Sequence, residues 1–330
     1  MEYRFLGKTG IKVSALCFGT MSFGREADEP AAAAMFQYCR EKGINFFDCA
    51  NVYGAGRAEE ILGRLIRNCR EEVVITSKAY FPTSEDINAR GASRYHLLNA
   101  VESSLKRLAT DRIDFYFIHR FDDRTPLEET LRALDDLVGQ GKILYPAASN
   151  FAAWQVEKAL GISATEGWAP LACLQPMYNL VKRQAEVEIL PVAEAENLGV
   201  IPYSPLGGGL LSGKYGVGKR PESGRLIDNK MYHTRYSLDW MFETADRFVE
   251  FARKNLFDPA GLAIAWVAGH PAVTAPIVGA RNLDQLKSAV AAMDIKMTSE
   301  LRGEISAFSP EPPLATDRNE ERTPFNYGMR

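Results

Sequence analysis

A regular alternation of short β-rich runs with longer amphipathic runs constrains the fold more than any other feature of the sequence. The short runs are apolar, rich in β-branched and aromatic residues and bounded by turn residues, which is typical of parallel strands covered by helices. The predicted strands are 13–19, 44–50, 72–78, 113–119, 143–150, 171–176, 200–206 and 274–280. The predicted helices are 30–43, 58–68, 93–108, 126–141, 151–160, 184–199, 237–255, 259–269 and 282–293. Eight strand–helix units predict an α/β fold of the (β/α)8 barrel type.

An open, doubly wound sheet is the rival architecture. It would usually carry a GxGxxG turn after its first strand, and "CFGTMSFG" from Cys17 does not match that pattern. We therefore expect one barrel domain over residues 1–330, with a short N-terminal β-hairpin, a long loop at 207–229 and a C-terminal arm over 309–330. The helix at 184–199 contains Pro191 and is expected to be kinked there.

Charge and cysteine content restrict the class of protein. The net charge of −3 provides no broad basic surface for nucleic acid or anionic lipid. The five cysteines are odd in number, have no CxxC spacing and fit free thiols in a reducing compartment. Neither a signal peptide nor an apolar stretch long enough to span a bilayer is evident, and no metal-ligand spacing appears. A cytoplasmic protein without a metal is expected.

Ionisable residues end three successive predicted strands. Asp48, Lys78 and His119 occupy these ends, and Tyr53 lies five residues beyond Asp48. Active sites of such barrels form at the carboxyl ends of the strands. Burying an unpaired charge there is costly, so we expect Asp48 and Lys78 to form an ion pair.

This group suggests a carbonyl reductase. A free tyrosine has a pKa of about 10, and a nearby ammonium would lower it. We expect Lys78 to lower the pKa of Tyr53, which would then donate a proton to a developing alkoxide. His119 would orient the carbonyl. No side chain donates hydride, so a nicotinamide or a flavin is required.

Each of these residues also has a structural interpretation. Asp48 alone could cap a turn, Tyr53 could be a packed aromatic, Lys78 could be solvated, and His119 could be a core histidine. Their common position in one architecture favours the catalytic interpretation. Cys49 has no evident base and is expected to fill space.

The ordered series of segments resembles the aldo-keto reductase superfamily. "FFDCANVYGAGRAEEILG" resembles the family's Asp–Tyr segment, "ITSK" its lysine strand and "IDFYFIH" its histidine strand. "SNF", "LQPMYNL", "YSPLGGGLLSGKY" and "PIVGARNLDQL" resemble its later cofactor segments. The "YSPL" form is similar to the branch of bacterial reductases and potassium-channel β subunits.

The resemblance implies a reductase that uses NADPH, with a catalytic tetrad of Asp48, Tyr53, Lys78 and His119. It implies that Ser149, Asn150 and Gln175 hold the carboxamide and that Tyr203 stacks on the nicotinamide. The full set of implied cofactor residues is Gly19, Thr20, Asp48, Ser149, Asn150, Gln175, Tyr203, Ser204, Pro205, Leu206, Gly208, Arg225, Gly279, Arg281 and Gln285.

Two departures from the family pattern affect these expectations. Pro146-Ala147 stands where the family commonly has a glycine, which predicts a different geometry for the fifth strand. Ala289 stands where many members have an asparagine against the adenine, so NADH is a possible cofactor. Arg281 favours NADPH because a guanidinium suits a 2′-phosphate.

The expected substrate pocket is mostly aromatic. It comprises Met21, Tyr53, Tyr80, Phe81, His119, Phe121 and Phe151, with Phe23 as a further candidate. An apolar lining favours a hydrophobic carbonyl compound, whereas Arg120 would favour an anion if it pointed inward.

Two other functions compete with carbonyl reduction. A regulatory subunit would hold NADPH, turn over slowly and report redox state to a partner. A barrel hydrolase would use Asp48 and a second carboxylate, which the strand ends do not supply. A homo-oligomer is compatible with these features of the sequence.

Overall fold

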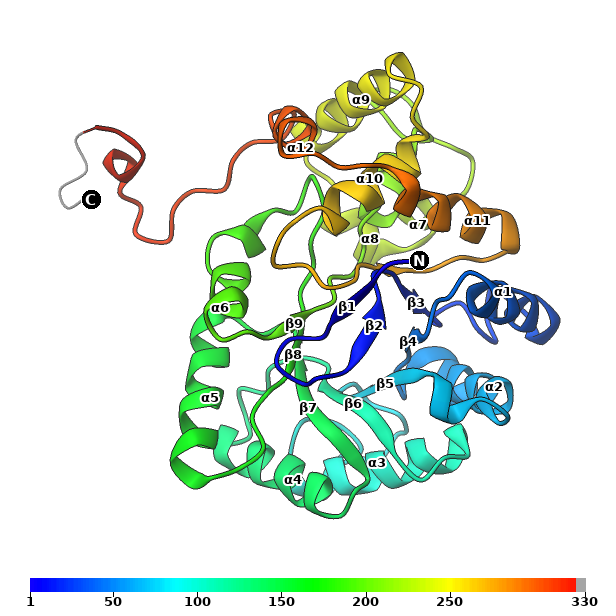
Figure 1. The fold of residues 1–330 in the computed structure, drawn as a ribbon, viewed down its shortest axis with the longest axis vertical. Helices are drawn as coiled ribbons and strands as arrows, with labels where there is room; N and C mark the ends of the chain where they lie inside the picture. Colours follow the sequence, from blue (N-terminus) through cyan, green and yellow to red (C-terminus); the bar gives the residue numbers. More distant parts are fainter. Residues whose placement is uncertain (325–330) are drawn as a thin grey trace.

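Eight parallel strands form a ring at the centre of this computed structural model, which describes residues 1–324. Neighbouring strands follow chain order, and the last strand pairs with the first. Hydrogen bonds from Thr274 N to Val200 O and from Ile277 N to Pro202 O, both 2.9 Å, close the ring. The predicted (β/α)8 barrel is confirmed. Its strands are β3 (Cys17–Gly19), β4 (Phe46–Asp48), β5 (Val74–Ala79), β6 (Ile113–Ile118), β7 (Ile143–Ser149), β8 (Cys173–Gln175), β9 (Gly199–Val200) and β10 (Ile277–Val278) (Figure 1).

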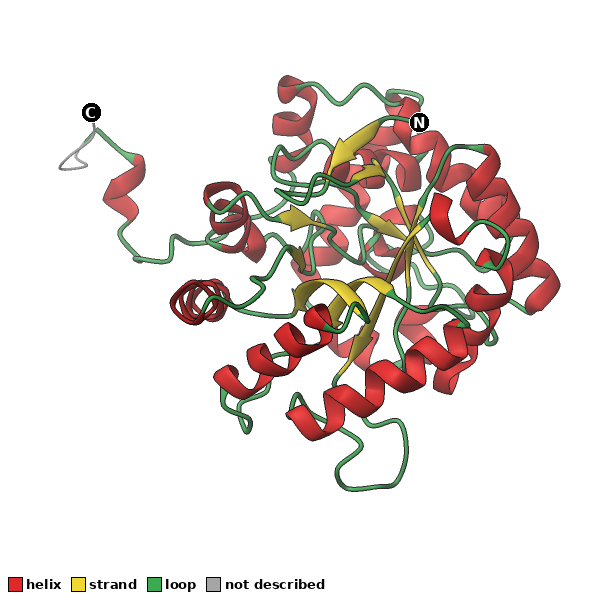
Figure 2. Cartoon of the chain, turned by 60° about the horizontal axis from the view of Figure 1, so that its bottom comes forward, coloured by secondary structure: helices red, strands yellow, loops and turns green. Residues whose placement is uncertain are grey.

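Helices surround the strands on the outside (Figure 2). Local sequence sets where several begin: the Asp28 carboxylate accepts from Ala31 N before α1, and the Ser93 hydroxyl accepts from His96 N before α3. The α-helices are α1 (Glu29–Glu41), α2 (Arg57–Ile66), α3 (Arg94–Leu108), α4 (Leu127–Gly139), α5 (Ala153–Glu166), α6 (Ile189–Ala195), α7 (Arg225–Asp228), α8 (Lys230–Arg235), α9 (Asp239–Lys254), α10 (Pro259–Ala268), α11 (Leu283–Ala291) and α12 (Ser299–Ser306). The 3₁₀ turns are η1 (Tyr53–Gly56), η2 (Arg70–Glu72), η3 (Gln184–Glu186), η4 (Gly207–Ser212), η5 (Ala292–Asp294) and η6 (Asn319–Arg322).

A short antiparallel hairpin closes the N-terminal end of the barrel. Its strands are β1 (Tyr3–Phe5) and β2 (Lys12–Ser14). Leu6, in the turn between them, is fully buried against Gly199 of β9, where an added Cβ would lie 2.4 Å from Leu6 Cδ1. The expected hairpin is therefore present. The predicted strand at 13–19 was wrong in extent, because its first residues belong to β2 and only its last three to the barrel.

The predicted kinked helix at 184–199 is also wrong. The segment forms the turn η3 and a separate helix, α6, in which Pro191 is the third residue. Proline lacks an N–H and clashes with the preceding turn of a helix. A helix that contains Pro191 is therefore most stable if it begins only a few residues before the proline. Strand β7, by contrast, runs without interruption through Pro146, which pairs with Tyr116.

Two further segments differ from expectation. The long loop at 207–229 contains the turn η4 and helix α7. Helix α12, near the C-terminus, was not predicted. Beyond it, the chain runs away from the barrel as an arm that includes η6 (Figure 1). Residues 325–330 of the predicted arm lie outside the described residues.

Among residues 1–324, no helix is both long enough and apolar enough to cross a bilayer.

Helices α2 and α3 approach each other closely at a glycine. A Cβ added to Gly63 of α2 would lie 2.5 Å from the carbonyl oxygen of Leu108 and 2.8 Å from that of Arg107. These atoms are backbone, so a larger residue would have to separate the two helices. Gly161 of α5 differs, because an added Cβ there meets nothing within 4 Å.

We predict opposite effects of alanine at these two helical glycines. Gly63→Ala should lower the free energy of unfolding by about 1–3 kcal/mol through overpacking. Gly161→Ala should raise it by about 0.5–1 kcal/mol, because alanine is the better helix former. Denaturant unfolding of both variants measures this, and a stabilised Gly63→Ala would contradict the close contact.

Candidate active site

A buried ion pair joins the ends of β4 and β5. Lys78 Nζ lies 2.6 Å from Asp48 Oδ1 and also donates to the backbone carbonyl of Cys49 at 2.7 Å. Thr76 Oγ1 and Gln175 Nε2 donate to the same carboxylate oxygen at 2.7 and 2.8 Å. Lys78 is fully buried and Asp48 is 2 % exposed. These contacts offset the cost of removing both charges from water.

Tyr53 lies in the turn η1, directly after β4. The amine of Lys78 is 5.2 Å from the centroid of the Tyr53 ring. Burial, followed by the negative charge of Asp48, raises the pKa of Tyr53 well above its usual value. The expectation that Lys78 lowers this pKa is wrong for the protein alone, because Asp48 stands beside the ammonium and burial disfavours a phenolate. Tyr53 therefore keeps its proton at neutral pH.

His119 follows β6 and faces Tyr53. Their ring centroids are 6.0 Å apart in an edge-on arrangement, and Phe81 contacts the histidine ring at 4.9 Å. Burial, then the charge of Lys78, lowers the pKa of His119 well below its usual value, so the ring is neutral at neutral pH. Its Nδ1 is buried and has no hydrogen-bond partner among residues 1–324. A free buried nitrogen of this kind suits a polar group of a bound molecule.

The turn that carries Tyr53 has an unusual backbone. Gly54, Ala55 and Gly56 all have positive φ, and Ala55 reaches +54° although it has a Cβ. Such a conformation persists only where neighbouring contacts hold it. Burial of Cys49 raises the pKa of its thiol, and the part of this residue that contacts the site is its backbone carbonyl.

Glu59 anchors this turn and was not anticipated from the sequence. It is fully buried and accepts hydrogen bonds from Ser77 Oγ at 2.5 Å and from Arg107 Nε at 2.7 Å. Ser77 precedes Lys78, so β5 is bonded to Asp48 on its inner side and to Glu59 on its outer side. A detectable signal existed, because Glu59 falls on the apolar stripe of α2 with Leu62 and Ile66.

A second polar group lies at the ends of β7 and β8. Ser149 Oγ donates to Gln175 O at 2.9 Å, and Asn150 Nδ2 donates to Ser149 Oγ at 3.0 Å and to His119 O at 2.9 Å. Tyr203 donates its hydroxyl to Asn150 Oδ1 at 2.7 Å. Asn150 has φ +57°, a strained value for a residue with a side chain. The structure thus brings together the four residues expected around the carboxamide and nicotinamide.

A glycine turn follows β9. Ser204 has φ +60°, and Gly207, Gly208 and Gly209 have φ values of +58°, +69° and +98°. Backbone N–H groups in such turns can form concave sites for anions. Those of Gly207 and Gly209 donate within the turn, to Ser204 O at 2.9 Å and to Leu206 O at 3.0 Å. Pro205 and Leu206 lie between these residues and are buried and partly buried, respectively.

Three cations lie near this glycine turn. The pKa of Lys214 is lowered by burial and by the positive charges of Arg281 and Arg225. Gly209 lies against Lys214, since an added Cβ would be 3.3 Å from its Nζ. Within residues 1–324, none of the three cations has an ion pair. The glycines and lysines of the stretch 207–220 suggest phosphate contact, but Lys214 was not named among the predicted cofactor residues.

Other expected cofactor residues lie where β3 and β10 end side by side. The hydroxyl of Thr20 donates to Asp48 O at 2.9 Å, and a Cβ on Gly279 would lie 3.8 Å from Gly19 O. Gln285 Oε1 accepts from Arg281 N at 3.0 Å, so this side chain holds the arginine's backbone.

The expected pocket residues form two aromatic groups. Tyr80 packs edge-on against Phe81, with centroids 5.4 Å apart. Phe121 packs against Phe151 at 5.2 Å and against Trp154 at 6.0 Å. Trp154, which is 62 % exposed, was not among the predicted residues.

Two other expected pocket residues lie on the loop after β3. Phe23 was placed wrongly, because it is fully buried and its ring contacts Phe18 in the core. Met21 is partly exposed.

A small cavity and a surface hollow lie in different parts of the molecule. A cavity of about 10 Å³ lies beside Asn150, Gln175 and Pro176. A surface hollow of about 560 Å³ lies outside the barrel between α2 and α3, remote from the strand ends, so we do not place the reaction there. The part of the chain that the structure describes contains no group of three or more His, Cys, Asp or Glu that could hold a metal ion.

Comparison with known proteins agrees with this geometry. The Aldo/keto reductase family profile matches residues 15–309. The uncharacterized oxidoreductase YrpG of Bacillus subtilis is 37% identical over 94% of this chain and 97% of its own length. A probable voltage-gated potassium channel subunit beta of Oryza sativa is 35% identical (96% and 99%), and versiconal hemiacetal acetate reductase of Aspergillus parasiticus is 33% identical (91% and 94%). The chain belongs to the aldo/keto reductase family.

Proposed function

We propose that this oxidoreductase uses NADPH to reduce an aldehyde or ketone to an alcohol, with Tyr53 as the proton donor. The observation that carries the proposal is the buried Asp48–Lys78 pair beside Tyr53 and His119 at the carboxyl ends of adjacent strands. Similarity to versiconal hemiacetal acetate reductase and to a protein of Schizosaccharomyces pombe named putative aryl-alcohol dehydrogenase supports chemistry on the CH–OH/C=O couple.

The residues present fit a nicotinamide dinucleotide. The unpartnered Nδ1 of His119 and the Gln175 amide, which uses one hydrogen for Asp48, offer polar contacts to a carboxamide. Asn150 donates both amide hydrogens within the protein, to Ser149 Oγ and His119 O, and would exchange one of them to bind the carboxamide. Tyr203 offers a ring for stacking. Backbone N–H groups of the glycine turn and the nearby cations offer contacts to phosphates. When bound, the reduced nicotinamide supplies the hydride.

The chain's own residues supply the proton and the electrostatics. Tyr53 enters the reaction neutral and transfers its hydroxyl proton to the carbonyl oxygen as that oxygen becomes negative. The ammonium of Lys78 has three hydrogens, of which Asp48 and Cys49 accept two, so one remains to stabilise the phenolate. Neutral His119 donates a hydrogen bond to the same oxygen.

The three cations near the glycine turn favour NADPH over NADH. Lys214 and Arg281 are close enough for their charges to interact, and the described residues contain no acid paired with either. Mutually repelling cations gain stability when a phosphate binds between them. NADH remains the alternative, since the small Ala289 offers no amide to the adenine.

A regulatory role is the second candidate function. It rests on the similarity to probable potassium channel β subunits of Oryza sativa and Arabidopsis thaliana. Such a subunit would release its cofactor slowly and turn over poorly. Stopped-flow measurement of NADPH release, set beside steady-state rates on a panel of aldehydes and ketones, separates the two functions.

We also propose in which compartment the protein acts and what it binds. The five cysteines are unpaired, which favours a reducing cytoplasm. We expect a single barrel domain whose partners are small carbonyl compounds, in a monomer or a homo-oligomer, without nucleic acid or membrane.

Removal of the Tyr53 hydroxyl tests the proton donor. Tyr53→Phe should lower kcat by about 10²–10⁴-fold, the usual contribution of a general acid. The Kd for NADPH should stay within about twofold, as measured by fluorescence titration. Tyr95→Phe, which alters an exposed tyrosine of α3, is the matched control. Near-normal turnover by Tyr53→Phe would exclude this residue as the donor.

The pKa of Tyr53 in the cofactor-free protein can be measured directly. A raised pKa means that no phenolate of this residue should form below about pH 10. Ultraviolet difference spectra of wild type and Tyr53→Phe should therefore coincide across neutral pH and separate only above it. Separation near neutral pH would show that Lys78 outweighs burial and Asp48.

Removing one cation tests the phosphate site. Lys214→Met should weaken NADPH binding by about tenfold or more and leave NADH binding nearly unchanged. Lys158→Met removes the same charge from an exposed position on α5 and should change neither affinity. Equal loss for both cofactors would place Lys214 away from the 2′-phosphate.

A further inference from the structure

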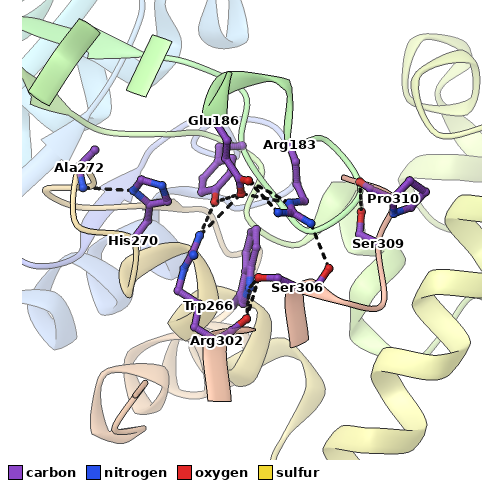
Figure 3. Close-up of polar contacts among 10 residues, drawn as sticks. Arg183, Glu186, Trp266, His270, Ala272, Arg302, Ser306, Ser309 and Pro310 are labelled. Carbon is purple, nitrogen blue, oxygen red and sulfur yellow. Dashed lines mark hydrogen bonds and ion pairs between the residues drawn. The ribbon is translucent and has the colours of Figure 1, made fainter. Parts of the chain in front are cut away.

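Helix α12 is attached to the barrel by a cluster of polar side chains, shown in Figure 3. We call this the α12 cluster; its members are Tyr178, Arg183, Glu186, Trp266, Arg302 and Ser306. They come from the segment after β8, from α10 and from α12. The cluster lies outside the site described above, and the proposed reaction does not use its side chains.

Glu186 is the centre of the cluster. It accepts hydrogen bonds from Arg183 Nη2 at 2.8 Å and from the Tyr178 hydroxyl at 2.5 Å. Burial alone would raise the pKa of Glu186, but these two donors hold it below its usual value, so the carboxylate is charged. Arg302 Nη2 donates to the Tyr178 hydroxyl at 2.7 Å and lies 3.7 Å from Glu186.

Several contacts join α12 to this centre. Arg183 Nη1 donates to Ser306 O at 3.0 Å, and Trp266 Nε1 donates to Ser306 Oγ at 3.0 Å (Figure 3). The guanidinium of Arg302 lies 4.8 Å from the centroid of the Trp266 ring. Trp266 and Tyr178 are fully buried, with ring centroids 5.2 Å apart. Release of α12 would expose this packed surface and leave Glu186 with one cation fewer.

The segment after β8 also forms hydrogen bonds, on its other side, to Tyr203 and Ser204 of the expected cofactor site. Tyr203 N donates to Pro176 O at 3.0 Å, and Tyr178 N donates to Tyr203 O at 3.4 Å. Asn179 Nδ2 donates to Ser204 O at 2.9 Å, next to the strained φ of +60° at Ser204. Residues 176–179 are thus fixed by α12 on the outside and fix Tyr203 and Ser204 on the inside.

We propose that Arg302 is a positioning residue for the cofactor site and that docking of α12 is thermodynamically linked to NADPH binding. The proposal rests on the proposed function, because it assigns Tyr203 and Ser204 to the nicotinamide and pyrophosphate. Undocking α12 frees the Tyr178 side chain and loosens the segment that holds these two residues. Linkage is reciprocal, so NADPH must also hold α12 in place.

Arg70 provides a matched control at the opposite end of the barrel. Its guanidinium donates to Asp114 Oδ1 at 2.9 Å and to the carbonyls of Val73 and Arg112 at 3.0 Å. It is mostly buried, as Arg302 is, and joins loops before β5 and β6 rather than at the strand ends where the cofactor is expected. A purely structural role for Arg302 would make the two arginines equivalent.

The first experiment compares Arg302→Met with Arg70→Met. Both should lower Tm in the absence of cofactor. Only Arg302→Met should weaken NADPH binding, by about fivefold or more in a fluorescence titration, the usual lower range for coupled sites. With saturating NADPH its kcat should stay close to wild type. Equal NADPH affinities for the two variants would overturn the proposal.

The second experiment needs no variant. Hydrogen exchange of the wild-type backbone amides in α12 should slow on addition of NADPH, whereas those of α4 should not change. Unchanged exchange in α12 at saturating NADPH would overturn the linkage even if Arg302→Met fails to fold. If the wild type does not bind NADPH at all, the proposed function fails, and this outcome is distinct from a wild type that binds without protecting α12.

Discussion

The buried ion pair of Asp48 and Lys78 is the interaction on which the rest of the site depends. Two opposite charges at the ends of neighbouring strands are stable without water only if further hydrogen bonds support them. Thr76, Gln175 and the Cys49 carbonyl supply such bonds. The pair therefore fixes three strand ends relative to one another, and it places a cation beside an aromatic ring without requiring any flexible loop to do so.

The pair also explains why a charged neighbour does not by itself make an acid stronger. Burial, followed by the negative charge of Asp48, raises the pKa of Tyr53 even though the ammonium of Lys78 lies beside its ring. The same burial keeps His119 neutral. In such a site Tyr53 and His119 both stay neutral and keep their protons. One of them gives up its proton only when negative charge develops on a ligand oxygen.

The barrel and the residues at its strand ends could be predicted because both depend on short-range periodicity and on one rule about where parallel strands end. Asp48, Lys78 and His119 were found in this way. Glu59 was missed although it lies on the apolar stripe of α2, because its partner Arg107 comes from α3. Lys214 was not singled out because the arginines beside it are distant in the sequence. The shift of Tyr53 was predicted in the wrong direction because a sequence shows charges but not how deeply they are buried.

The alternation of side chains along β5 has a consequence for folding. Ser77 faces the helices and Lys78 faces the interior, one residue apart. If β5 paired one residue out of register during folding, Lys78 would face the helices and Asp48 would remain buried without its partner. Such a chain would lose both its activity and its stability. Selection for activity therefore also disfavours barrels with the wrong strand register.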